Sequence, residues 1–71
     1  MDYITVKTDS GYDITINVED IVSFYDAHWD GLEKTRISLK NSEYVKTASP
    51  ISKPLRQYLS RLGYNTARIG E

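Results

Sequence analysis

The 71-residue chain contains no cysteine, and it has only two prolines and four glycines. Without cysteine, the protein cannot have a disulfide framework, a thiolate zinc site or a cysteine nucleophile, and it does not require an oxidising compartment. No run of residues approaches the ~18 consecutive apolar residues of a membrane span, and the N-terminus lacks the basic start and apolar stretch of a signal peptide. We therefore expect a cytoplasmic protein with no membrane association.

Groups that carry out catalysis are also scarce. His28 is the one histidine, and the four glycines are isolated, so no glycine-rich phosphate loop is present. Asp26, His28 and Asp30 stand at alternate positions, and in an extended segment they could hold a cation together with Glu33. A solvated polar loop is the more common role for such residues. We therefore predict that the protein is not an enzyme and has no metal site and no cofactor.

The composition that remains is typical of one small globular domain. Hydrophobic residues make up 39% of the chain and charged residues 27%, and six tyrosines are present. A chain of this length forms only one core, and burial in so small a core barely offsets the entropy cost of folding. We assign residues 1–63 to a single domain and residues 64–71 to a C-terminal tail, which is either frayed or a short extra strand.

Five short segments alternate between apolar and polar residues, as half-buried strands do. The predicted strands cover residues 3–7, 13–16, 21–25, 35–39 and 44–47. Asp9-Ser10-Gly11 and Asn41-Ser42 are turn sequences, and Asn17 is expected to cap a single helical turn. Residues 26–32 contain Asp30-Gly31 and little apolar periodicity, so we predict a loop there.

One helix is predicted after the strands. Ser49-Pro50 ends the sheet, and Pro54 is tolerated only in the first turn of a helix, so Ser52 is the expected N-cap. Gly63 is the expected C-terminal stop. The apolar stripe of this helix has the spacing i, i+3, i+4 and i+7 and consists of Leu55, Tyr58, Leu59 and Leu62.

This stripe matches the apolar face of the predicted sheet. The residues expected on that face are Ile4, Val6, Ile14, Ile16, Val22, Phe24, Ile37, Leu39 and Val45. We therefore predict an α+β fold, in which a twisted antiparallel sheet of about five strands carries one C-terminal helix packed on one face.

The other face of the sheet would carry aromatic and basic side chains that one short helix cannot cover. Tyrosine and arginine are enriched among the residues that dominate binding energy at interfaces. Trp29 is expected on the exposed loop tip beside Asp30-Gly31, where a large ring supports the same interpretation. The alternative is that tyrosines merely favour strands. The predicted partner-binding residues are Tyr3, Tyr25, Trp29, Arg36, Tyr44 and Lys46, with the Arg36 guanidinium stacked on the Tyr44 ring.

Charge is divided unequally along the chain. Residues 1–33 have a net charge of −7 and residues 34–71 a net charge of +6. One explanation is that the two halves face each other and partly cancel. The other is a basic surface that binds nucleic acid, for which the helix would supply Lys53, Arg56 and Arg61.

The order of elements resembles two families over most of the chain. The order of strands, the Val18-Glu19-Asp20-Ile21 turn and the helix from Leu55 to Leu62 resemble small flagellar-operon proteins of the FlbD type. Val6-Lys7-Thr8, Glu19-Asp20-Ile21-Val22 and the Tyr44 to Leu59 stretch resemble a truncated LytTR-like DNA-binding domain. The second resemblance implies a nucleic-acid-binding regulator.

Taken together, these features predict a noncatalytic protein-binding module, a regulatory or inhibitory protein of a bacterium or a phage. The expected partner is another protein, and self-association through an uncovered face or an unpaired edge is a version of the same idea. The alternative function is nucleic-acid binding through the basic second half.

Overall fold

The computed structural model describes residues 2–66 and has the predicted α+β class. In chain order its elements are β1 (Tyr3–Lys7), β2 (Asp13–Asn17), the 3-10 turn η1 (Val18–Asp20), β3 (Ile21–Trp29), β4 (Leu32–Leu39), β5 (Tyr44–Lys46) and α1 (Ser52–Arg61). The predicted turns at Asp9-Ser10-Gly11 and Asn41-Ser42 are confirmed, and so is the cap at Asn17, whose side chain accepts a hydrogen bond from the Glu19 N–H.

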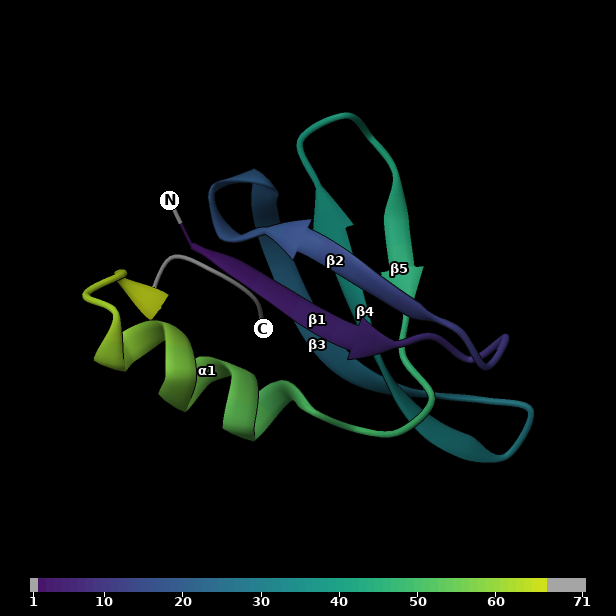
Figure 1. Cartoon of the computed structure of the whole chain (residues 1–71). Coiled ribbons are helices and arrows are strands. Elements are labelled where there is room, and N and C mark those ends of the chain that lie inside the picture. Colours follow the sequence, from purple (N-terminus) through teal and green to yellow (C-terminus); the bar gives the residue numbers. More distant parts are fainter. Residues whose placement is uncertain (1, 67–71) are drawn as a thin grey trace.

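The strands form two antiparallel sheets, so the predicted single sheet of five strands is wrong. One sheet is the β1–β2 hairpin and the other has the order β3–β4–β5. The hairpin lies across the three-stranded sheet, with α1 beside both (Figure 1). A single flat sheet would leave its apolar face to one short helix, whereas folding the hairpin over the other strands lets two apolar faces bury each other.

The two sheets are connected where β1 and β5 end. Thr8 and Thr47 form an isolated antiparallel bridge, and the Ala48 N–H donates to the Lys7 carbonyl over 2.9 Å. The Asp9 N–H donates to the Lys46 carbonyl over 3.0 Å. Because of these bonds, the turn after β1 lies along the edge of β5.

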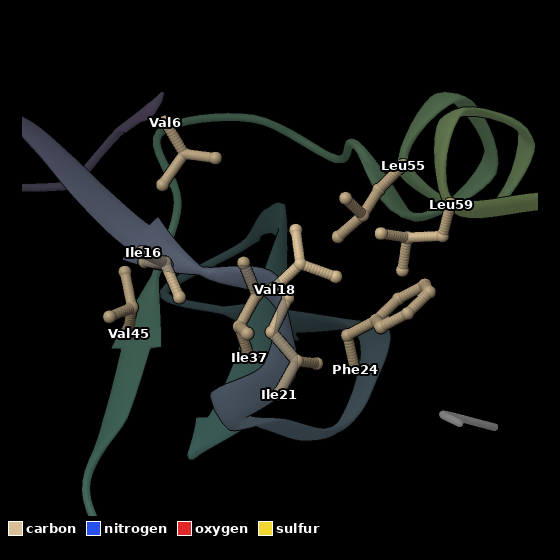
Figure 2. Close-up of a cluster of buried hydrophobic side chains, with 9 residues drawn as sticks. All are labelled: Val6, Ile16, Val18, Ile21, Phe24, Ile37, Val45, Leu55 and Leu59. Atoms are coloured by element: carbon tan, nitrogen blue, oxygen red, sulfur yellow. The ribbon is translucent and has the colours of Figure 1, made fainter. Parts of the chain in front are cut away.

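The core fills the space between the two sheets and α1 (Figure 2). Its buried residues are Val6, Ile16, Val18, Ile21, Phe24, Ile37, Val45, Leu55 and Leu59. Val22, which we expected in the core, is instead 51% exposed. The strand register shifts between Ile21 and Ser23, and this bulge places Ile21 and Phe24 on the same side.

Residues 26–32 are not a loop as predicted, because β3 and β4 continue through them as a long hairpin. Trp29 pairs with Leu32, and the two residues between them both have positive φ, 54° at Asp30 and 78° at Gly31. This is the geometry of a two-residue hairpin turn, for which Asp-Gly is a preferred sequence. The hairpin extends beyond the core, which explains why its residues show little apolar alternation.

The helix begins at Ser52, and Ile51 rather than Ser52 is the N-cap. The Ile51 N–H donates to Thr35 Oγ1 over 2.7 Å, so a buried threonine of β4 anchors the start of α1. At the other end Gly63 has a φ of 94°, and Tyr64 N–H donates to the Leu59 carbonyl. This left-handed glycine confirms the predicted stop.

Residues 64–66, the described part of the predicted tail, contact the domain. Tyr64 packs against the core, and its hydroxyl donates to Asp2 Oδ2 over 3.1 Å. Desolvation raises the pKa of the Tyr64 hydroxyl, and the hydrogen bond to Asp2 acts in the same direction. Residues 67–71 lie outside the described residues. Between residues 2 and 66, no helix has the length and apolar character that crossing a membrane requires.

Candidate partner-binding surface

The face of β3, β4 and β5 that points away from the β1–β2 hairpin carries the aromatic and basic side chains. Tyr25 pairs with Arg36 across β3 and β4, and Arg36 pairs with Lys46 across β4 and β5. Tyr44 and Trp29 lie on this face by alternation. We call this set of five residues, Tyr25, Trp29, Arg36, Tyr44 and Lys46, the aromatic–basic surface.

Arg36 lies at the centre of the aromatic–basic surface. Its Cζ atom is 4.2 Å from the centroid of the Tyr44 ring, so the predicted stacking is present. Its Nη1 atom is 3.5 Å from the Tyr25 hydroxyl oxygen, at the outer limit of a hydrogen bond. Its Nε atom is buried and has no hydrogen-bond partner among the described residues. A buried donor left unsatisfied costs about 1–3 kcal/mol, so this site has not been optimised for stability.

Lys46 and Trp29 form the second contact of this surface. Lys46 Nζ is 5.3 Å from the centroid of the Trp29 ring, a cation–π distance. Trp29 is therefore half-buried in β3 under a lysine, and it does not lie on a loop tip as we expected. Leu32, its partner across the hairpin, is 62% exposed and adds apolar area next to the ring.

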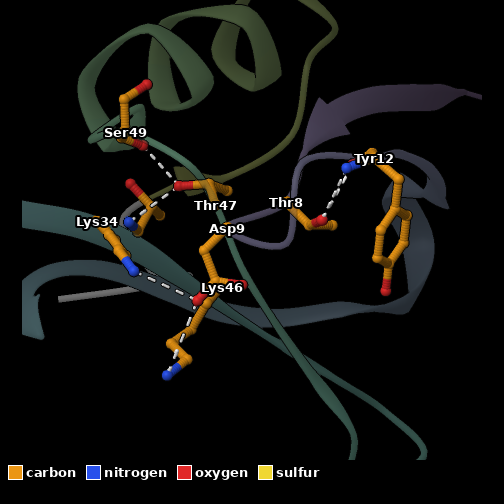
Figure 3. Close-up of polar contacts among 8 residues, drawn as sticks. Thr8, Asp9, Tyr12, Lys34, Lys46, Thr47 and Ser49 are labelled. Atoms are coloured by element: carbon orange, nitrogen blue, oxygen red, sulfur yellow. Dashed lines mark hydrogen bonds and ion pairs between the residues drawn. The ribbon is translucent and has the colours of Figure 1, made fainter.

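Asp9 borders the surface and pairs with Lys46 and with Lys34, which lies beside the surface (Figure 3). Its Oδ2 atom is 3.4 Å from Lys34 Nζ and 3.9 Å from Lys46 Nζ. Asp9 belongs to the acidic half of the sequence and both lysines to the basic half, so the two halves partly cancel here. Our sequence reasoning assigned Asp9 only to a turn, although the opposite charges of the two halves were a signal for such pairs.

Arg36 differs from both lysines because no ion pair within residues 2–66 supplies it with a carboxylate. Its guanidinium is instead stacked on the Tyr44 ring, with Nη1 near the Tyr25 hydroxyl. A planar guanidinium held in one orientation is suited to a two-bond contact with a carboxylate.

Tyr3 does not belong to this surface. It lies on β1, in the other sheet, and its side chain is directed away from the core, so it is on the opposite side of the molecule. It borders a groove of about 390 Å³ together with Ile51, Pro54 and Tyr58. The structure therefore separates Tyr3 from the five other predicted binding residues.

The three basic residues predicted to contact nucleic acid all lie on or beside α1, but they differ in their surroundings. Arg56 Cζ is 4.9 Å from the Phe24 ring centroid, and Arg56 Nη1 donates to the Thr66 carbonyl over 2.7 Å. Arg56 thus helps to hold the C-terminal segment on the core. Lys53 and Arg61 are exposed.

The polar side chains around His28 have different surroundings. Asp26 Oδ1 accepts a hydrogen bond from Thr35 Oγ1 over 2.6 Å, His28 pairs with Glu33 across the hairpin, and Asp30 is in the turn. Within the described part of the chain, no group of three histidine, aspartate or glutamate side chains is placed to hold a metal ion.

Three buried threonines form polar contacts that our sequence reasoning missed. Thr8 Oγ1 donates to the Tyr12 carbonyl and accepts from the Tyr12 N–H, and Thr47 Oγ1 accepts from the Thr35 N–H. Thr47 Oγ1 also donates to the Ser49 carbonyl (Figure 3). A signal was present in the sequence, because Thr35 lies two positions before Ile37 on the same strand and therefore must share its inward face. The hydrogen bonds of Thr35 and Thr47 fix the segment between β5 and α1, and this segment positions the helix.

Comparison of the chain with protein-family models, with curated proteins and with solved structures found no match. The FlbD-type and LytTR-like resemblances therefore stay predictions. Function has to be inferred from the chemistry of the aromatic–basic surface itself.

Proposed function

We propose that the chain is a noncatalytic protein-binding module, a small regulatory or inhibitory protein of a bacterium or a phage, whose aromatic–basic surface binds another protein. The surroundings of Arg36 are the main support for this proposal. It is the cation of the surface without a carboxylate among the described residues, and its Nε is buried at an energetic cost. Polar groups left unsatisfied in a folded protein call for an explanation, and a binding role provides one.

The chemistry of the surface defines the kind of partner. The surface is positive, because Asp9 pairs with both Lys46 and the neighbouring Lys34, and Arg36 has no carboxylate among the described residues. Tyr44 is 52% exposed and Leu32 is 62% exposed, which provides apolar area around the charge. A protein surface that offers a carboxylate to Arg36, surrounded by apolar side chains, fits these features.

The proposal is tested by capture of the partner on the full chain carrying an affinity tag, from bacterial lysates with and without phage infection. We expect recovery of a stoichiometric protein by the wild-type chain. Arg36→Ala should weaken the affinity for that protein by more than about 1 kcal/mol, because truncation of a central arginine removes a major binding contact. The affinity is measured with the purified partner by calorimetry.

Two variants serve as controls. Arg61→Ala removes the same charge from the exposed helix and His28→Ala removes the one histidine, and neither should change the affinity. If Arg36→Ala binds as tightly as Arg61→Ala, the aromatic–basic surface is not the binding site. Salt-dependent binding to DNA that falls in Arg61→Ala would instead support the nucleic-acid alternative.

A further inference from the structure

The outer edge of β3 is unpaired within the described part of the chain. β3 ends the order β3–β4–β5, and no backbone bond joins residues 22–29 to any described residue outside β4. At nine residues, β3 is also the longest strand. It contains neither proline nor lysine, the residues with which edge strands are commonly protected from pairing.

The hydrogen bonds of β4 show which groups the edge of β3 presents. Thr35, the cross-strand partner of Asp26, directs its N–H to Thr47 Oγ1 and its carbonyl to the Thr47 N–H. Asp26 and Thr35 are therefore a pair without mutual backbone bonds, and the N–H and C=O of Asp26 point away from β4. The N–H and C=O of His28, two residues later, point away from β4 in the same way.

The side chains along this edge are self-complementary about Ala27. One residue away on either side are Asp26 and His28, and two residues away are Tyr25 and Trp29. We propose that a second copy of this chain pairs with β3 edge to edge, antiparallel, about a two-fold axis at Ala27. The result is a dimer with a continuous six-stranded sheet.

Charge selects this register over its neighbours. A two-fold axis at Asp26 would set two Asp26 carboxylates opposite each other, and an axis at His28 would set Asp26 opposite Asp30. With the axis at Ala27, Asp26 of each copy faces His28 of the other, so a carboxylate meets an N–H donor twice. Asp26 Oδ1 accepts a hydrogen bond from Thr35, and no hydrogen bond from a described residue reaches Oδ2.

The opposite side of the same register is aromatic. Tyr25 of each copy would lie across from Trp29 of the other, and such aromatic cross-strand pairs stabilise antiparallel strands. The two aromatic–basic surfaces would then adjoin in one sheet. Dimerisation is independent of the proposed protein partner, since purified chain alone is sufficient to observe it.

Disulfide trapping tests the register, because the chain has no cysteine of its own. In the proposed dimer the two Ala27 residues are directly opposite, at a Cα separation of ~4.5 Å that a disulfide can span. Mild oxidation of Ala27→Cys should give a covalent dimer at dilute concentration. Ser23→Cys, on the same face of the same strand, should not, because the two copies of residue 23 lie about 26 Å apart at ~3.3 Å per residue.

Sedimentation of the unmodified chain supplies the first measurement, and we expect twice the chain mass of 8.1 kDa. A chain that stays monomeric at millimolar concentration overturns the proposal, as does equal crosslinking of Ala27→Cys and Ser23→Cys. A monomer that captures another protein would leave the proposed function standing without the dimer.

Exchange of charges between copies tests the Asp26–His28 pairing. Asp26→Lys alone sets lysine against histidine, and His28→Asp alone sets two aspartates against each other, so each variant should dimerise at least about tenfold more weakly. An equimolar mixture restores an acid–base pair at both positions and should recover the wild-type affinity. Circular dichroism verifies that each variant is folded. A mixture no stronger than its components would show that residues 26 and 28 do not meet.

Discussion

The two faces of the three-stranded sheet differ in what covers them. On the inner face, Phe24 and Ile37 are 0% exposed, because the β1–β2 hairpin and α1 pack over them. On the outer face, Arg36 stacks on the Tyr44 ring and approaches the Tyr25 hydroxyl, and Tyr44 itself is 52% exposed. Adjacent positions of one strand therefore have different surroundings: the inner face is covered by the rest of the protein, and the outer face carries the surface that we propose binds a partner.

The largest expected effect comes from the centre of the inner face. Phe24→Ala should lower the free energy of unfolding by about 3–5 kcal/mol, because it removes a fully buried ring and leaves a cavity. A domain of this size has a total stability of roughly 4–11 kcal/mol, so much of the variant should be unfolded at 37 °C. Urea unfolding followed by circular dichroism measures the change. A loss below about 1 kcal/mol would mean that the core is not where the structure places it.

A smaller effect is expected from the buried polar contacts of the same face. Thr35→Val keeps the shape of the side chain but removes the hydroxyl that serves both Ile51 N–H and Asp26, so it should cost about 1–3 kcal/mol. Thr5→Val is the matched control, since among the described residues the Thr5 hydroxyl bonds only to Thr15, on the exposed side of the hairpin. Urea midpoints of the two variants should differ, and equal midpoints would contradict an anchoring role for Thr35.

The smallest effect is expected on the outer face. Arg36→Met retains an apolar stem and removes a buried N–H that has no described partner, so the lost cation–π contact and the relieved desolvation should nearly cancel. We expect the free energy of unfolding to change by less than about 1 kcal/mol, measured by the same urea titration. A destabilisation as large as that of Phe24→Ala would make Arg36 part of the core and remove the contrast between the faces.

Local patterns explain which parts of the fold were predictable. The strand alternation, the turn residues and the helix stop at Gly63 depend on neighbours within a few positions, and the structure has them. The long β3–β4 hairpin was missed because its tip extends past the core and therefore lacks apolar alternation. The Asp30-Gly31 sequence was the better guide there, since its positive φ angles suit a two-residue turn.

The aromatic–basic surface was predictable to the extent that alternation determines faces. Arg36, Tyr44 and Lys46 share a face because strands β4 and β5 are adjacent in sequence and joined by a short turn. Tyr3 was assigned to the same face only because a single sheet was assumed. The contact between Asp9 and Lys34 could not be assigned from a local pattern, because it spans 25 residues and depends on how the hairpin lies.

The amino-acid sequence by itself determined the elements and their two-faced character, since alternation and turn chemistry act over a few residues. Only the tertiary structure decided that the strands divide into two sheets, that Asp9 pairs with two lysines and that Arg36 is left without a carboxylate among the described residues. These outcomes depend on which apolar faces bury each other. Which apolar faces pack together depends on the whole chain, because the hydrophobic effect is non-directional and a local segment could pack against several others.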